Sequence, residues 1–116
     1  MAADQSAFWE KMELLVAECD IHLERPRGST HPSYPLIRYP LDYGYLGGTR
    51  SGDGAGIDVW LGAGDQDKVT ALICTFDGLK KDAELKLLLG CTQEESDRIE
   101  AFHNHGGQVG LMVYRK

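Results

Sequence analysis

The spacing of apolar side chains predicts an α-helix near each end of the chain. Between residues 4 and 19 they recur at the helical interval, at Phe8, Met12, Leu15 and Cys19. Thr92 and Glu95 have the spacing of a capping box, which predicts a second helix over residues 92–104. The apolar stripe of the first helix can pack onto the protein's own core or onto a second subunit. A homo-oligomer is therefore one of two alternatives that the sequence allows.

Other segments have the patterns of β-strands. Residues 57–61 alternate between apolar and mixed positions, as a half-buried strand does. Residues 68–76 are apolar on both faces, which indicates a strand buried in a sheet. A short strand is expected at residues 21–23 and a closing strand at residues 108–114.

The segment 82–89, DAELKLLL, is ambiguous because its residues favour a helix while its length and neighbours permit a strand. The chain of 116 residues is long enough to bury one core without a disulfide or a structural metal. The pattern therefore predicts one mainly β domain over residues 1–116, with its β core in residues 21–89 and a helix on either side.

The composition excludes several partners. The chain carries 18 acidic and 12 basic side chains, a net charge of −6, and no dense run of Lys and Arg. Nucleic acid is therefore not an expected partner, and a site for polyphosphate would need cations to reverse its local field. The sequence has no apolar run long enough to cross a membrane and no secretory leader. Three widely spaced cysteines fit a reducing cytoplasm.

Two familiar binding motifs and a histidine pair are rejected on their spacing. Gly52, Gly54 and Gly56 precede a predicted strand, so no helix N-terminus follows them to hold a phosphate. An EF-hand beginning at Asp53 would place apolar residues at ligand positions. His103 and His105, two apart on a predicted helix, point to different sides and are expected at the surface or the helix end.

Four aspartates in two similar settings are the best candidates for chemistry. Asp53 and Asp58 stand five apart, and Asp77 and Asp82 repeat that spacing downstream. Grouped carboxylates without soft ligands favour Mg²⁺ or Mn²⁺. Spacing alone favours solvated turn acids, since Asp-Gly is a common turn pair.

A longer motif changes that balance. The run Tyr39-Pro40-Leu41-Asp42-Tyr43-Gly44-Tyr45-Leu46, followed by Thr49, Asp53-Gly54 and Asp58-Val59, resembles the signature of the soluble family I inorganic pyrophosphatases. The resemblance extends to Glu24-Arg25-Pro26-Arg27-Gly28-Ser29 and to the pair Asp77 and Asp82. It covers a little over half of the chain.

The resemblance implies a fold, a cofactor and a reaction. The fold would be a small closed β-barrel of the OB type with flanking helices. Asp53, Asp58 and Asp82 would be catalytic and would hold Mg²⁺, or Mn²⁺, with Asp77 and Glu24 as further metal contacts. Tyr43, Arg38 and Arg27 would bind the substrate, pyrophosphate or a related small phosphate compound. A metal-held hydroxide would then hydrolyse pyrophosphate to two phosphates.

The chain departs from the family pattern at several functional positions. Ala55 stands where the family has an aspartate thought to help deprotonate the attacking water, and Gly56 replaces a proline. Ser33, Glu84 and Gly106-Gly107 replace residues that carry or position charge in the family. An enzyme of reduced efficiency is therefore expected. The alternatives are a hydrolase of a larger phosphate compound, or a non-catalytic descendant that binds metal, phosphate or a partner.

Overall fold

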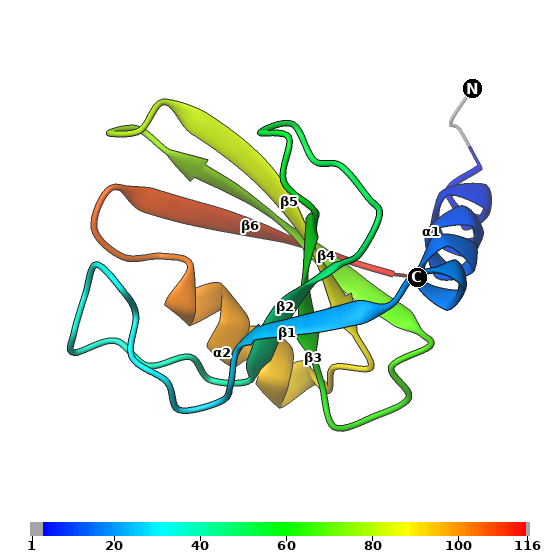
Figure 1. Cartoon of the computed structure of the whole chain (residues 1–116), viewed down its shortest axis with the longest axis horizontal. Helices are drawn as coiled ribbons and strands as arrows, with labels where there is room; N and C mark the ends of the chain where they lie inside the picture. The colour runs from blue at the N-terminus through cyan, green and yellow to red at the C-terminus, as the bar shows by residue number, and fades with distance from the viewer. Residues whose placement is uncertain (1–3, 116) are drawn as a thin grey trace.

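One six-stranded sheet with a helix on each face makes up the fold (Figure 1). The computed structural model describes residues 4–115. Its elements are, in chain order, α1 (Ser6–Glu18), β1 (Ile21–Arg25), β2 (Asp42–Leu46), β3 (Ile57–Leu61), β4 (Val69–Asp77), β5 (Asp82–Leu89), α2 (Gln93–Phe102) and β6 (Gln108–Tyr114). The protein is therefore mainly β, as the sequence predicts, and the ambiguous segment 82–89 is a strand.

The strands follow the order β1-β2-β3-β5-β4-β6 across the sheet. All neighbours are antiparallel except β3 and β5, which run parallel with Asp58 opposite Lys86. β1 and β6 are the edges, and within residues 4–115 no pairing joins them. The sheet that these residues form is open, so the predicted closed barrel is not confirmed.

Each face of the sheet carries its own core. On one face α1 packs through Trp9 and Val16 onto Val59, Leu72 and Leu87. Glu13 fixes the helix there, because its Oε1 accepts a hydrogen bond from the Val69 N–H at 3.1 Å and pairs with Arg115. The apolar face of α1 thus packs onto its own sheet. Phe8, which the helical spacing placed inward, is half exposed.

The opposite face is covered by α2 and by the loop before β2. Its core joins aromatic and aliphatic side chains of six elements and that loop, namely Tyr39, Leu41, Tyr43, Trp60, Ala71, Ile73, Leu88, Ile99 and Met112. α2 begins with the predicted capping box, in which Thr92 and Glu95 each bond the other's backbone N–H. This aromatic core forms the floor beneath the candidate site.

A buried histidine connects α2 to this core. His103, at the C-terminal end of α2, is 3% exposed, and its Nε2 accepts a hydrogen bond from Trp60 Nε1 at 3.0 Å. Its Nδ1 lies 3.0 Å from Gln108 Oε1 and donates to it in the neutral tautomer. Burial is the main cause that lowers the pKa of His103 to about 4. The histidine is therefore neutral near pH 7 and belongs to the core.

Strand β2 was not anticipated from the sequence. It contains Gly44, a residue that is uncommon in strand interiors. The structure explains this glycine, because a Cβ at position 44 would collide with the carbonyl oxygen of His22 in β1. The close approach of β1 and β2 thus requires glycine at position 44, and a glycine there lowers the strand propensity from which β2 would be predicted.

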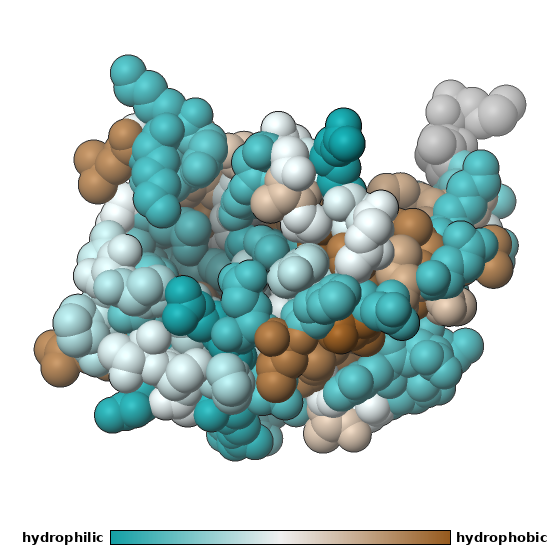
Figure 2. All heavy atoms as spheres, in the orientation of Figure 1, coloured by the Kyte–Doolittle hydropathy of each residue, from teal (hydrophilic) through white to brown (hydrophobic). Residues whose placement is uncertain are grey.

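The α1 side of the sheet is left partly bare. Beyond α1, strands β4, β5 and β6 expose an apolar face without a charged side chain, made of Cys74, Phe76, Ala83, Leu85, Val109, Leu111 and Val113. The view in Figure 2 is mainly hydrophilic, with hydrophobic side chains gathered over β1 and toward α1. Neither described helix is long and apolar enough to cross a membrane.

Strand β6 lies at the edge of the sheet, and the Asn104 side chain covers its middle. Asn104 Oδ1 accepts a hydrogen bond from the Gly110 N–H at 3.2 Å, and Nδ2 donates to the Gly110 carbonyl at 3.3 Å. The amide thereby bonds both backbone groups of one edge residue, as a neighbouring strand would.

Candidate functional site

Asp53 and Asp58 of the pyrophosphatase-like motif lie in the loop before β3 and at the start of β3. The loop before β3 is closed by Thr49, whose hydroxyl donates to the Leu46 carbonyl at 2.7 Å and accepts from the Ile57 N–H at 2.9 Å. Pairing with β2 and β5 then fixes Asp58 opposite Tyr45 and Lys86. The threonine of the motif thus holds the loop and β3 in place.

A cavity of about 470 Å³ lies at this loop and collects three predicted metal ligands. It is lined by Glu24, Tyr45, Asp53, Ala55, Gly56 and Asp58. Gly56 is needed there, because a Cβ would come within 2.7 Å of the Tyr45 ring. Carboxylates from β1, the loop and β3 therefore face one space, and we call it the acidic cavity.

Asp53 is ionised and held by its own loop. Its Oδ1 accepts hydrogen bonds from the Ser51 hydroxyl and from the Ala55 N–H, the latter at 3.0 Å. These bonds lower the pKa of this exposed carboxyl. The loop therefore presents a negative charge to the acidic cavity, and residue 55 supplies only a backbone donor.

Lys86 is a functional-site residue that sequence reasoning missed. It is 4% exposed, and its Nζ lies 2.9 Å from Asp58 Oδ2, 2.8 Å from Glu84 Oε2 and 2.8 Å from Tyr43 Oη. Burial lowers the pKa of the ammonium, but Asp58 and Glu84 outweigh it and the net shift is upward. Lys86 is therefore a buried cation between the core and the acidic cavity.

Tyr43, predicted to bind substrate, lies beneath Lys86. It is 8% exposed, and its hydroxyl accepts the hydrogen bond from Lys86 Nζ. Burial, followed by the charge of Asp58, raises the pKa of Tyr43. Its ring packs on Trp60 with centroids 4.6 Å apart. In this structure Tyr43 belongs to the core that supports the site.

Asp77 and Asp82 are not brought to the acidic cavity. They pair with each other in register at the hairpin between β4 and β5. Asp77 Oδ1 accepts from the N–H groups of Leu79 and Lys80 at 2.9 and 3.1 Å, which stabilises the hairpin turn. Asp82 is exposed. The metal-binding role implied for both acids and the catalytic role implied for Asp82 stay predictions.

The two predicted substrate-binding arginines also lie outside the acidic cavity. Arg38 donates from Nη1 to the Gly28 carbonyl at 3.0 Å, within the loop between β1 and β2. Arg27 lines a different cavity, next to Glu95 and Arg98 of α2. Their roles in binding phosphate stay predictions.

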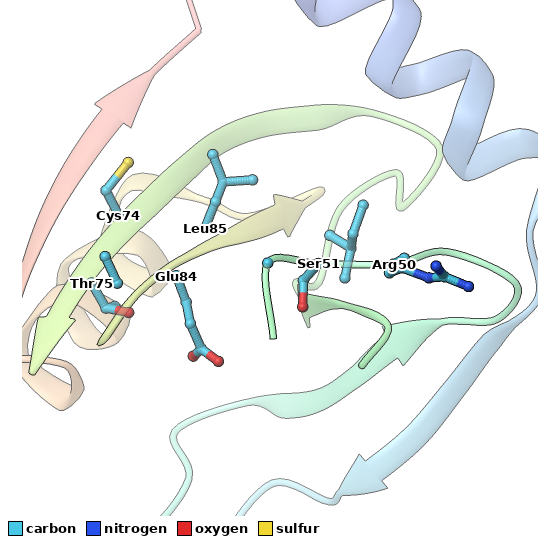
Figure 3. Close-up of a pocket in the computed structure, with 9 residues that line it drawn as sticks. Arg50, Ser51, Cys74, Thr75, Glu84 and Leu85 are labelled. Carbon is cyan, nitrogen blue, oxygen red and sulfur yellow. The ribbon is translucent and has the colours of Figure 1, made fainter. Parts of the chain in front are cut away.

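A second cavity adjoins the acidic one under the same loop (Figure 3). It has a volume of about 410 Å³ and is lined by Arg50, Ser51, Gly52, Ile57, Cys74, Thr75, Ala83, Glu84 and Leu85. Figure 3 shows Thr75 and Glu84 projecting from the sheet on one side, with Ser51 and Arg50 on the loop opposite. Glu84 of this second cavity bonds Lys86, which also bonds Asp58 of the acidic cavity.

Comparison with solved structures identifies the architecture. The chain aligns with an inorganic pyrophosphatase from Helicobacter pylori at 12% identity and a TM-score of 0.60, covering 84% of each chain. An inorganic phosphatase from Anaplasma phagocytophilum aligns at 14% identity and a TM-score of 0.55 over 81% of each chain. An inorganic pyrophosphatase from Coxiella burnetii aligns at 12% identity and a TM-score of 0.50 over 84% of each chain.

The protein has an inorganic pyrophosphatase-like fold. No protein-family model and no curated protein matches the sequence. The likeness therefore concerns the architecture, and the residues of this chain must carry any argument about chemistry.

The metal pair that a pyrophosphatase-like fold implies does not fit these side chains as they stand. Among residues 4–115, no three His, Cys, Asp or Glu side chains come close enough together to hold a metal ion. Asp58 shares one oxygen with the Lys86 ammonium, while Asp77 and Asp82 lie at the hairpin. We therefore derive no catalytic step through a resident metal.

Proposed function

We propose that this protein is a slow hydrolase of pyrophosphate, or of a related small phosphate compound, that takes its substrate as the complex with Mg²⁺ or Mn²⁺. The observation that carries the proposal is the convergence of Glu24, Asp53 and Asp58 on one cavity in a pyrophosphatase-like fold. We place the protein in the cytoplasm, since its three free cysteines fit a reducing compartment.

The charge of the acidic cavity supports a metal-complexed substrate. Glu24 and Asp53 form no salt bridge with any residue among 4–115, so their charges face the cavity uncompensated. Free pyrophosphate would be repelled by them. A divalent ion carried on the substrate reverses the sign of that interaction and offers the carboxylates a hard cation that they bind well.

Position 55 accounts for the low rate. Ala55 lines the acidic cavity but has no group that can take a proton from attacking water. A positioned general base contributes typically about 10² to 10⁴ in rate. The protein therefore binds and orients its substrate but leaves proton removal to solvent.

Phosphate release from pyrophosphate in the presence of Mg²⁺ tests the proposal. We expect slow, Mg²⁺-dependent release by the wild type and at least a tenfold loss in Asp53→Asn, because that variant removes a carboxylate from the cavity while keeping its shape. Asp67→Asn is the matched control, since Asp67 is exposed and lies outside the acidic cavity. Equal rates in the wild type and Asp53→Asn would refute the proposal.

A second candidate function is binding without turnover. It is favoured by Lys86, which neutralises Asp58, and by Ala55, which removes the base. The same assay separates the candidates when it is paired with calorimetry of Mg²⁺ and pyrophosphate. Saturable binding that Asp53→Asn abolishes, with no phosphate release from the wild type, would establish this second function.

Self-association through the bare face of β4, β5 and β6 is part of the proposal. The strand side chains of that face are uncharged, and Arg50 of the loop before β3 borders only its edge at Cys74, Ala83 and Leu85. The strands of two copies of a chain with net charge −6 can therefore meet there without like charges in contact. We expect light scattering to give a dimer mass that Leu111→Lys reduces to that of a monomer. Leu36→Lys is the control, because Leu36 is also an exposed leucine but lies in the loop before β2. A monomeric wild type at high concentration would contradict the proposal.

A further inference from the structure

The carboxylate of Asp58 is already neutralised by a cation that belongs to the chain. We propose that the Lys86 ammonium is a tethered cation that takes the place of a divalent ion between Asp58 and Glu84, so that the folded protein binds no such ion there. The inference concerns metal binding and does not depend on turnover.

The contacts of Lys86 are saturated. An ammonium has three N–H donors, and Nζ has three oxygen partners, at Asp58 Oδ2, Glu84 Oε2 and Tyr43 Oη, all between 2.8 and 2.9 Å away. These are distances of charge-assisted hydrogen bonds. No donor is left over for a phosphate. Lys86 therefore acts on the acidic residues of the site and is not a free substrate-binding group.

The backbone delivers Lys86 to this position. Asp58 and Lys86 are partners in the parallel pairing of β3 with β5, which continues through Val59, Trp60 and Leu61. Tyr43 faces Trp60 across β2 and β3, and the ammonium lies 5.4 Å from the centroid of the Tyr43 ring. Because these strands lie in the middle of the sheet, the lysine cannot leave without disturbing the core.

A divalent ion would have to compete with this arrangement. The Lys86 side chain is 5% exposed, whereas those of Asp58 and Glu84 are each 27% exposed. An ion bound between the two carboxylates would meet a buried positive charge about 3 Å away, where like charges repel strongly. It would also need the Asp58 and Glu84 oxygens that the ammonium holds. The wild-type site therefore excludes an ion at Asp58, leaving Glu24 and Asp53 to face the cation of a substrate.

Removing the ammonium should open the site to metal. Lys86→Met keeps most of the aliphatic stem and leaves the Asp58 and Glu84 carboxylates beside each other without a cation. In the wild type the Asp58 and Glu84 oxygens lie 2.9 and 2.8 Å from Lys86 Nζ, the position that an ion would take. These distances are nearer to the 2.3–2.6 Å of Ca²⁺ ligands than to the 2.0–2.1 Å of Mg²⁺ ligands. We therefore expect a gain in affinity for both ions that is larger for Ca²⁺.

Calorimetric titration with Ca²⁺ and with Mg²⁺ tests this inference. We expect Lys86→Met to bind Ca²⁺ at least tenfold more tightly than the wild type does, and the double variant Lys86→Met/Asp58→Asn to lose that gain. Lys68→Met is the matched control, because Lys68 is exposed and forms no salt bridge among residues 4–115. A folded Lys86→Met that binds Ca²⁺ no more tightly than the wild type would overturn the inference.

A measurement on the wild type keeps the inference testable if Lys86→Met does not fold. In a sample with ¹⁵N-labelled lysine, we expect one ammonium signal with protons protected from solvent exchange, unchanged by millimolar Mg²⁺ or Ca²⁺. Loss of that protection on adding either ion would mean that the metal displaces Lys86, which is the opposite of the proposal. Neither the calorimetry nor the NMR measurement uses pyrophosphate, so the outcome of each is independent of the hydrolysis assay.

Discussion

Replacing Ala55 with aspartate should raise the rate of phosphate release from pyrophosphate by about 10² or more. Ala55 lines the acidic cavity in an exposed loop, so a carboxylate at this position can face a substrate without disturbing the core. A base placed within reach of the attacking water contributes typically about 10² to 10⁴ in rate. The gain should appear in kcat, because the new group acts on proton removal more than on binding.

An amide at position 55 separates proton removal from other effects of a larger side chain. Ala55→Asn has the shape of the aspartate variant but cannot act as a base near pH 7, so its rate should stay at that of the wild type. Steady-state kinetics of the three proteins, each with Mg²⁺, give the comparison. Equal rates in Ala55→Asp and Ala55→Asn would mean that residue 55 does not limit the reaction.

Lowering the pH from 7.5 to 5 should reduce the free energy of unfolding by about 2 kcal/mol through His103 alone. The folded pKa of His103 is about 4, below the 6.5 of an unfolded histidine, so between these values the unfolded chain binds more protons. The stability that neutral His103 provides is thus fully present above pH 6.5 and is lost as the pH falls toward 4.

Urea unfolding of the wild type and His103→Gln at several pH values measures this effect. The variant should be less stable at pH 7.5, because it disturbs the partners Trp60 and Gln108, but it should lose about 2 kcal/mol less on going to pH 5. Taking the difference removes the contribution of other groups, including His31, whose pKa burial also lowers. His22→Gln, at an exposed histidine away from Trp60 and Gln108, is the control for the substitution itself. Parallel pH profiles for wild type and His103→Gln would contradict the assignment.

Most of the regular elements follow from local pattern. The strand predicted at residues 57–61 is β3, that at residues 108–114 is β6, and α2 begins at its capping box. Local pattern did not predict the element where a contact between distant segments determines the residue or its conformation. Gly44 is selected by the nearness of His22, and helix-forming residues in β5 become a strand because β3 and β4 lie on both sides of it.

The candidate site is only partly readable from the sequence. The motif directed attention to Asp53, Asp58 and Glu24, and the structure places all three on one cavity. Lys86 was missed because a lysine among alternating residues of a strand normally faces solvent. Its burial depends on the parallel register of β3 and β5, which joins residues 28 positions apart and leaves no local signature. The sequence feature that could have indicated a buried Lys86 is its place between Glu84 and Leu88 on one face of the strand.

The side chain of Asn104 has a consequence for how copies of this protein can associate. By occupying both main-chain groups of Gly110, it denies an incoming strand its anchoring hydrogen bonds at the middle of β6. Growth by successive addition of strands, the route to open-ended fibres, is thereby obstructed at this end of the sheet. Copies that associate through β4, β5 and β6 must therefore pack the apolar faces of these strands against each other. Such packing buries both faces and gives a closed pair to which no third copy can add in the same way.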